Sequence, residues 1–206
     1  MMAGPSGIGK TTLAKILSED LNIPFISGSY SELVPSTKDV KHEDMIKKNT
    51  QDILQEDIDL FRKRRDIFNN AIEFISDRSF VDNIAYHINK LSYQVDESDI
   101  TIFIDACIQS LATIPTHLIF IPYRADMIDS FKIEDNHKRI INPWYQIQIS
   151  SLMTTIITQL LNKTFMTKDN YKSMVSKEDG LKVLVLLTTN LEERVNITKQ
   201  FLTDES

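Results

Sequence analysis

The sequence is poor in the residues that build disulfides, metal–thiolate sites and flexible linkers. It has one cysteine, Cys107, with five glycines and six prolines in 206 residues. A single cysteine excludes an intramolecular disulfide and a cysteine-built metal site. So few glycines and prolines argue against long flexible linkers. We therefore expect one domain over residues 1–206, in a reducing compartment.

Long apolar runs and an excess of positive charge are also missing. No apolar run approaches the roughly eighteen residues that span a bilayer, and the N-terminus lacks the apolar stretch of a secretory signal. The formal net charge is −6, so the field of the whole molecule repels polyanions. We expect a cytoplasmic protein without membrane contact, for which nucleic acid is a disfavoured partner.

A phosphate-binding loop stands at the start of the chain instead. Two glycines, a lysine and a threonine have the spacing of the Walker A motif, directly before a helical pattern. Glycines let main-chain amides approach phosphates closely, and the positive end of the helix adds to them. We predict that ATP contacts Gly4, Pro5, Ser6, Gly7, Ile8, Gly9, Lys10, Thr11 and Thr12.

Three side chains of this motif have predicted roles. Lys10 should reach the β- and γ-phosphates as a point charge, and the Thr11 hydroxyl should be a ligand of Mg²⁺ that bridges them. Thr12 should contact the α-phosphate. The predicted cofactors are ATP and Mg²⁺.

Apolar periodicity predicts strands that alternate with helices. This order predicts an α/β fold with a mostly parallel central sheet covered on both sides. Together with the phosphate loop, it predicts the three-layer α/β/α fold of a P-loop NTPase. We expect the strand at 182–187 to be buried on both faces, since it is uninterruptedly apolar. The expected strands are 23–26, 71–76, 117–122 and 182–187, and the expected helices are 10–22, 50–69, 82–91, 99–113, 143–161 and one capped by Asn190.

The first strand is a problem for this prediction. Only Met1, Met2 and Ala3 precede the loop, which is short for the strand that carries a phosphate loop. The alternatives are a stunted first strand and a start that lies upstream, and we favour the upstream start.

A second motif follows the strand predicted at 71–76. Asp77 at the carboxyl end of a parallel strand would face the crevice where α/β folds bind ligands. It could hold Mg²⁺ through water or accept a proton from an attacking hydroxyl. Arg78 could bridge donor and acceptor phosphates, because a guanidinium binds phosphate oxygens in pairs. A surface ion pair that opens a helix is the alternative.

The segment from Asp77 to Tyr86, taken with the phosphate loop, resembles a known family. It is similar to the Asp-Arg-aromatic…Ser…Ala-Tyr-Gln segment of thymidylate kinases. It is closer to the Asp-Arg-Ser…Asp…Ala-Tyr segment of small phage and bacterial AAA-type nucleoside and nucleotide kinases. The resemblance implies that Asp77 and Arg78 lie beside the magnesium ion and the two phosphoryl groups. Asp77 would then be a second metal ligand, beside Thr11. It also implies substrate contacts from Asp82 and Tyr86.

The nature of the acceptor follows from a missing carboxylate. Deoxynucleoside kinases generally place a glutamate after the strand that follows the loop's helix, but 25–30 reads Phe-Ile-Ser-Gly-Ser-Tyr. A phosphate acceptor is already largely ionised at neutral pH and needs no strong base. We therefore predict a (deoxy)nucleoside monophosphate kinase, an ATP-dependent phosphotransferase whose partner is a small nucleotide.

Arginines elsewhere could complete the site. The polar stretch 123–142 is predicted to be a lid that supplies arginine to the γ-phosphate, with Arg124 as the first catalytic candidate and Arg139 as the second. A solvated loop without function is the alternative. The basic run 62–65 could reach the acceptor phosphate, although a solvated helix end is favoured. By the family's layout, the turn 188–190 would lie near adenine.

Two other functions stay open at this point. The same chemistry could act on a nucleoside, a ribosylnicotinamide-type compound or a hydroxymethylated base in phage DNA. The chain could instead be an ATP-hydrolysing switch or motor subunit, which would need an arginine finger and an oligomer. A homodimer is compatible with the sequence.

Overall fold

A computed structural model describes residues 1–33, 49–124, 142–161 and 180–203. Helices and short strands alternate along these residues, as the apolar pattern predicts. The strands are β1 (Met2–Ala3), β2 (Phe25–Ile26), β3 (Ile75–Ser76), β4 (His117–Phe120) and β5 (Lys182–Val185). The helices are α1 (Lys10–Leu21), α2 (Tyr30–Leu33), α4 (Thr50–Asn69), α5 (Phe80–Leu91), α6 (Glu97–Thr113), α7 (Pro143–Leu161) and α9 (Leu191–Thr203).

The paired strands all run parallel. One sheet has the order β1-β4-β5, and β2 pairs with β3 in a second sheet. Met2 lies opposite Ile119 and Ile119 opposite Leu184, while Phe25 lies opposite Ile75. Parallel strands need crossover connections, which place helices on the faces of the sheet.

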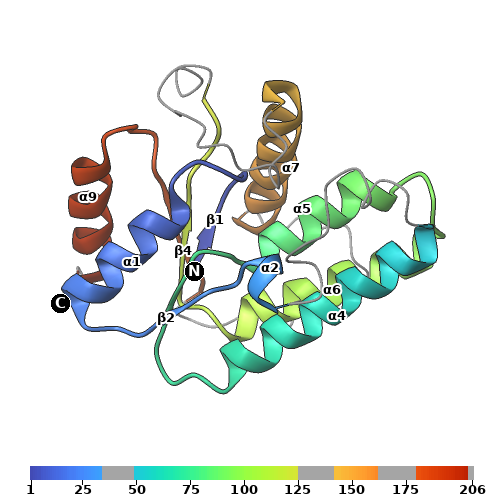
Figure 1. The fold of residues 1–206 in the computed structure, drawn as a ribbon, viewed down its shortest axis with the longest axis horizontal. Coiled ribbons are helices and arrows are strands. Elements are labelled where there is room, and N and C mark those ends of the chain that lie inside the picture. Colours follow the sequence, from blue (N-terminus) through green and yellow to red (C-terminus); the bar gives the residue numbers. More distant parts are fainter. Residues whose placement is uncertain (34–48, 125–141, 162–179, 204–206) are drawn as a thin grey trace.

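Strand β4 and Ile121, the residue directly after it, supply side chains to two hydrophobic cores, one on each face. Leu118 and Phe120 belong to one core and Ile119 and Ile121 to the other, as the two-residue period of a strand requires. The first core packs against α4, α5, α6 and α7, and the second against α1 and α9, which lie side by side (Figure 1). The structure is a three-layer α/β/α fold, which confirms the predicted fold class.

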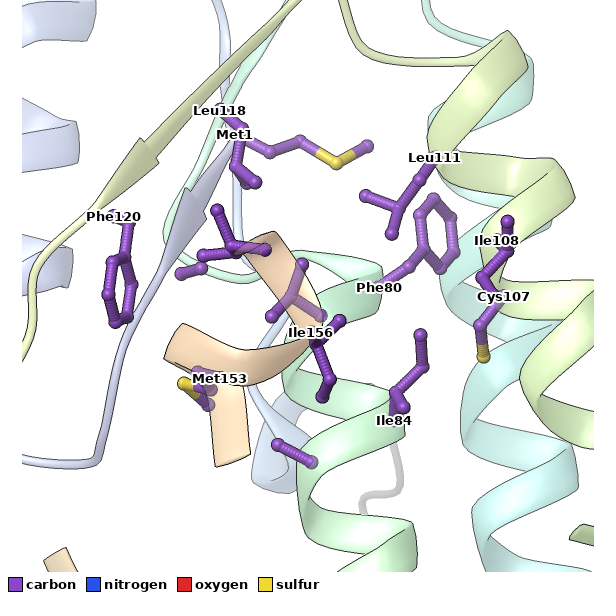
Figure 2. Close-up of a cluster of buried hydrophobic side chains, with 14 of the residues drawn as sticks. Met1, Phe80, Ile84, Cys107, Ile108, Leu111, Leu118, Phe120, Met153 and Ile156 are labelled. Atoms are coloured by element: carbon purple, nitrogen blue, oxygen red, sulfur yellow. The ribbon is translucent and has the colours of Figure 1, made fainter. Parts of the chain in front are cut away.

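The larger core is centred on α5. Figure 2 shows Phe80 and Ile84 of α5 gathered with Cys107, Ile108 and Leu111 of α6. At most 2% of each of these residues is exposed. Helix α5 therefore has a fixed position, and its first turn directly follows Asp77 and Arg78.

Strand β1 is short, as predicted, yet it is paired along its length. The amides of Ile119 and Ile121 donate to the carbonyls of Met1 and Ala3 at 2.9 and 3.0 Å. Met2 and Ala3 are completely buried. The three residues before the phosphate loop are therefore firmly attached to β4.

Some boundaries differ from those predicted. Helix α5 begins at Phe80 and not at Asp82, because Ser79 and Asp82 form a capping box around its first turn. The expectation that 182–187 is buried on both faces is wrong. Among the described strands β5 pairs with β4 alone, and 46% of Val185 is exposed.

Within the part of the chain that the structure describes, no helix combines the length and the apolar character needed to cross a membrane.

Replacement of Leu111 by alanine tests the larger core. Leu111 is 1% exposed, whereas Ile102 on the same helix is 68% exposed. Leu111→Ala is expected to lower the free energy of unfolding by about 2–5 kcal/mol, because it leaves a cavity. Ile102→Ala, the matched control, should change it by less than about 0.5 kcal/mol. Urea denaturation measures both, and equal losses would contradict the assignment of this core.

Candidate active site

The loop between β1 and α1 has the backbone conformation that its glycines predict. Gly4, Gly7 and Gly9 have φ angles of 148°, 87° and 87°, which side-chain-bearing residues rarely adopt. A Cβ atom on Gly4 would also collide with the carbonyl oxygen of Ile121. The loop therefore lies directly against the chain that follows β4.

A pocket of about 300 Å³ opens over this loop. It lies at the N-terminus of α1, where unpaired amides and the helix dipole favour an anion. Most of its lining comes from the predicted loop, and one side chain comes from the turn after β3. The lining residues are Ser6, Gly7, Gly9, Lys10, Thr11, Thr12 and Arg78.

The ammonium group of Lys10 is held at the loop. Its Nζ donates to the carbonyl of Pro5 at 2.6 Å and also to that of Gly4. Lys10 is only 5% exposed. The positive charge therefore lies among the main-chain groups that would surround a phosphate.

Asp77 lies beside Thr11, as the two motifs predict. The Thr11 hydroxyl donates to Asp77 Oδ2 at 2.6 Å, and the amide of Gly28 donates to Oδ1 at 3.0 Å. Hydroxyl and carboxylate oxygens are ligands that Mg²⁺ prefers, and Mg²⁺ bound to phosphates needs only one or two protein ligands. The described residues contain no cluster of three or more metal-binding side chains. The residues present fit a Mg²⁺ ion carried by a nucleotide.

Arg78 extends from the turn after β3 to the phosphate loop. Its guanidinium donates to Asp82 Oδ1 at 3.0 Å and to Ser6 Oγ at 3.4 Å. The Tyr86 hydroxyl lies 3.1 Å from the same Ser6 oxygen. Burial alone would lower the pKa of Arg78, but the carboxylate of Asp82 raises it above its ordinary value. A permanent positive charge therefore stands at the edge of the pocket.

Asp82 positions both Arg78 and the start of α5. Its Oδ2 accepts from the Ser79 hydroxyl and amide at 2.9 and 3.0 Å, while Oδ1 faces Arg78. Both carboxylate oxygens are thus engaged within the protein. Substrate binding by Asp82 and Tyr86 stays a prediction.

Arg124, the first lid candidate, does not join this group. Arg124 is exposed and donates to the carbonyl of Leu187 beyond β5, and it does not line the pocket. Arg139 and nearly all of the predicted lid lie outside the described residues. A role for Arg124 in phosphoryl transfer therefore stays a prediction.

Arg64 is buried beside the site, which the sequence did not predict. The expectation of a solvated helix end is wrong for this residue, which is 3% exposed. Its guanidinium donates to the carbonyl of Gly28 and to the side chain of Asn83. The signal was in the spacing, because Arg64 stands three residues after Phe61 and four before Phe68, on the buried stripe of α4.

Arg194 was missed as well. It is 4% exposed, and its guanidinium donates to the carbonyls of Thr188 and Ile8 at 2.7 and 2.8 Å. Burial lowers its pKa. Arg194 thus connects the turn before α9 to the phosphate loop. An arginine in the first turn of a polar helix carries no sequence signal for such a contact.

Comparisons with known proteins agree with this architecture. A family model described as the ATPase family associated with various cellular activities (AAA) matches residues 1–130. No curated protein matches the chain in sequence.

Structures of deoxyadenosine kinase from M. mycoides have a similar fold. The one with bound dCTP has a TM-score of 0.65 at 14% identity, over 98% of this chain and 96% of that chain. The one with bound dATP has the same score and identity, over 98% and 97%. The one with the products dCMP and dCDP has a TM-score of 0.64 at 15% identity, over 100% and 98%. At these identities the likeness is one of fold.

The contact from α9 to the phosphate loop can be tested with Arg194→Met. This variant is expected to lose about 1–3 kcal/mol of unfolding free energy, because two carbonyls lose a buried donor. We also expect weaker ATP binding, since Ile8 belongs to the loop. The control is Lys199→Met on the same helix, whose partly exposed ion pair with Asp20 at 3.2 Å is worth less than about 1 kcal/mol. Chemical denaturation and ATP titration measure both, and identical results for the two variants would contradict the role of Arg194.

Proposed function

The chain belongs to the ATPase family associated with various cellular activities (AAA), and from this premise we propose that it is an ATP-dependent kinase. Its reaction would move the γ-phosphate of ATP to a (deoxy)nucleoside monophosphate. One observation carries the proposal: Arg78, from the turn after β3, lines the same pocket as the phosphate loop, and its neighbour Asp77 accepts a hydrogen bond from Thr11 of that pocket. An ATP-binding loop alone needs neither residue.

The proposed roles follow from the charges in the pocket. Lys10 and the loop amides would hold the β- and γ-phosphates. Thr11 and Asp77 would hold Mg²⁺, which neutralises charge between these phosphates when it is bound. Arg78 would contact the transferred group from the turn after β3. Such a site acts mainly by positioning and by electrostatic stabilisation.

The transfer itself exchanges one bond for another. An oxygen of the acceptor phosphate would attack the γ-phosphorus in line, and a new P–O bond would form. The bond from the γ-phosphorus to the β–γ bridging oxygen would break, and ADP would leave with that electron pair. The guanidinium of Arg78 would neutralise the charge that two phosphates bring together.

The hydrogen bonds that the Asp77 carboxylate accepts favour a phosphate group as the acceptor over a hydroxyl group. Both oxygens of its carboxylate accept hydrogen bonds, from Thr11 and from Gly28. Asp77 is 2% exposed and does not line the pocket, so this carboxylate can orient the Mg²⁺ site through Thr11 but is poorly placed to take a proton from a hydroxyl in the pocket. An acceptor that is already ionised needs no base, whereas a bare 5′-hydroxyl benefits from one.

A nucleoside acceptor is the second candidate. The Tyr30 hydroxyl donates to Glu56 Oε2 at 2.9 Å, so a carboxylate of α4 approaches the segment just after β2. Deoxyadenosine kinase, whose fold is similar, has a nucleoside in its name. Glu56 would then supply the base that the end of β2 itself lacks.

An acceptor panel distinguishes these functions. Purified protein with MgATP is expected to convert at least one nucleoside monophosphate to a diphosphate, detected by chromatography of labelled products. Transfer to nucleosides alone would favour the second candidate. ATP hydrolysis that no acceptor stimulates would contradict both and support a switch or motor subunit.

Replacement of Lys10 tests the phosphate loop directly. Lys10→Ala is expected to lower transfer by about 10³-fold or more, because a charge directed at the developing negative charge is lost. Circular dichroism should show an intact fold. Lys15→Ala, an exposed lysine on the same helix, is the control and should keep full activity. Activity close to that of the wild type in Lys10→Ala would refute the assignment.

A further inference from the structure

We propose that Arg64 is a positioning residue for the nucleotide site: it holds the main chain of Gly28, which in turn holds the Asp77 carboxylate against Thr11. The inference rests on the proposed function, because it concerns the Mg²⁺·ATP site. Arg64 itself does not line the pocket.

The partners of Arg64 are neutral oxygen atoms. Its guanidinium donates to the carbonyl of Gly28 and to Asn83 Oδ1, with a longer contact of 3.4 Å to the carbonyl of Ser79. None of these hydrogen bonds goes to a carboxylate. Burial of a charge without a direct counter-ion is costly, and burial lowers the pKa of Arg64 to about 10. An apolar side chain would fill this place on α4 at a lower cost in free energy. The hydrogen bonds that Arg64 makes are therefore the feature that needs an explanation.

Gly28 transmits the position of Arg64 to Asp77. Its carbonyl accepts from Arg64 and its amide donates to Asp77 Oδ1 at 3.0 Å. The other carboxylate oxygen accepts from Thr11 at 2.6 Å. A continuous path of hydrogen bonds thus runs from α4 through the end of β2 to the predicted metal ligands. Outer partners of this kind orient the groups that bind a metal.

The space around Gly28 leaves little freedom for another arrangement. A Cβ atom at Gly28 would lie 2.6 Å from Arg78 Cβ and 3.3 Å from Arg64 Nε. Real Cβ contacts are longer than the first of these, so only glycine fits between the two arginines. The same guanidinium contacts Ser79 and Asn83 in the first turn of α5. The guanidinium of Arg64 therefore contacts both segments that lie next to Asp77, which are the turn after β2 and the start of α5.

The test is the Mg²⁺ dependence of ATP binding, measured by calorimetric titration, together with the transfer rate. Arg64→Met is expected to weaken the apparent affinity for Mg²⁺ by about tenfold, in the range found for outer partners of metal ligands. The control is Arg62→Met on the same helix, whose side chain is 63% exposed, and it should behave as the wild type. A purely structural role would lower the melting temperature of Arg64→Met and leave its Mg²⁺ affinity unchanged, which would overturn the proposal.

A double-mutant cycle with Asp77→Asn tests the path of hydrogen bonds from Arg64 through Gly28 to Asp77. If Arg64 acts through Asp77, Arg64→Met should weaken Mg²⁺ binding by less than about twofold in the Asp77→Asn background, since coupled residues are not additive. Losses that multiply would overturn the proposal.

Arg64→Lys covers the case in which Arg64→Met does not fold. Lysine keeps the charge but lacks the fork that contacts Gly28 and Asn83 together, so we expect an intermediate, several-fold loss of Mg²⁺ affinity. A folded Arg64→Lys variant with wild-type Mg²⁺ affinity would overturn the proposal. Failure of the proposed function has a different signature: the wild type would transfer phosphate to no acceptor, while the binding experiment would still report on Arg64.

Discussion

The hydrogen bond between Thr11 and Asp77 joins two parts of the fold that share no strand pairing. Thr11 belongs to the helix that follows β1, and Asp77 follows β3 in the other sheet. The carboxyl ends of both strands meet here, where open α/β sheets bind ligands. The pocket, the position of Arg78 and the proposed metal site all depend on this junction. The contact of Arg78 with Ser6 joins the phosphate loop to the Asp-Arg motif at a second point.

Four buried or half-buried cations surround this junction in a protein of net charge −6. They are Lys10, Arg64, Arg78 and Arg194. Three of them, Lys10, Arg64 and Arg194, donate to main-chain carbonyls that shape the site. A local positive field inside an acidic molecule attracts a small anion into the pocket, while the outer surface repels long polyanions. Under the proposed function, this distribution favours a nucleotide over DNA as the acceptor.

The sequence predicted the features that depend on residues close together in the chain. Glycine spacing identified the loop, apolar periods located the helices, and Asp77 was correctly placed at a strand end beside Thr11. The strand ends were less accurate, because pairing over two residues leaves almost no periodic signal. Arg64 lies on the apolar face of α4, which the sequence shows, but its charge led to the expectation that it is exposed. The contact of Arg194 with Ile8 was beyond prediction, since it depends on how α9 packs against α1.

The contact between Arg194 and Ile8 joins positions that are 186 residues apart in the chain. The ribosome makes the phosphate loop 186 residues before it makes Arg194, so the loop gains this donor only when α9 emerges and docks. Contacts this distant in sequence form late. A nascent chain thus carries the whole nucleotide motif long before it carries the support for that motif. Full affinity for the nucleotide would then follow the docking of α9 rather than the synthesis of the motif.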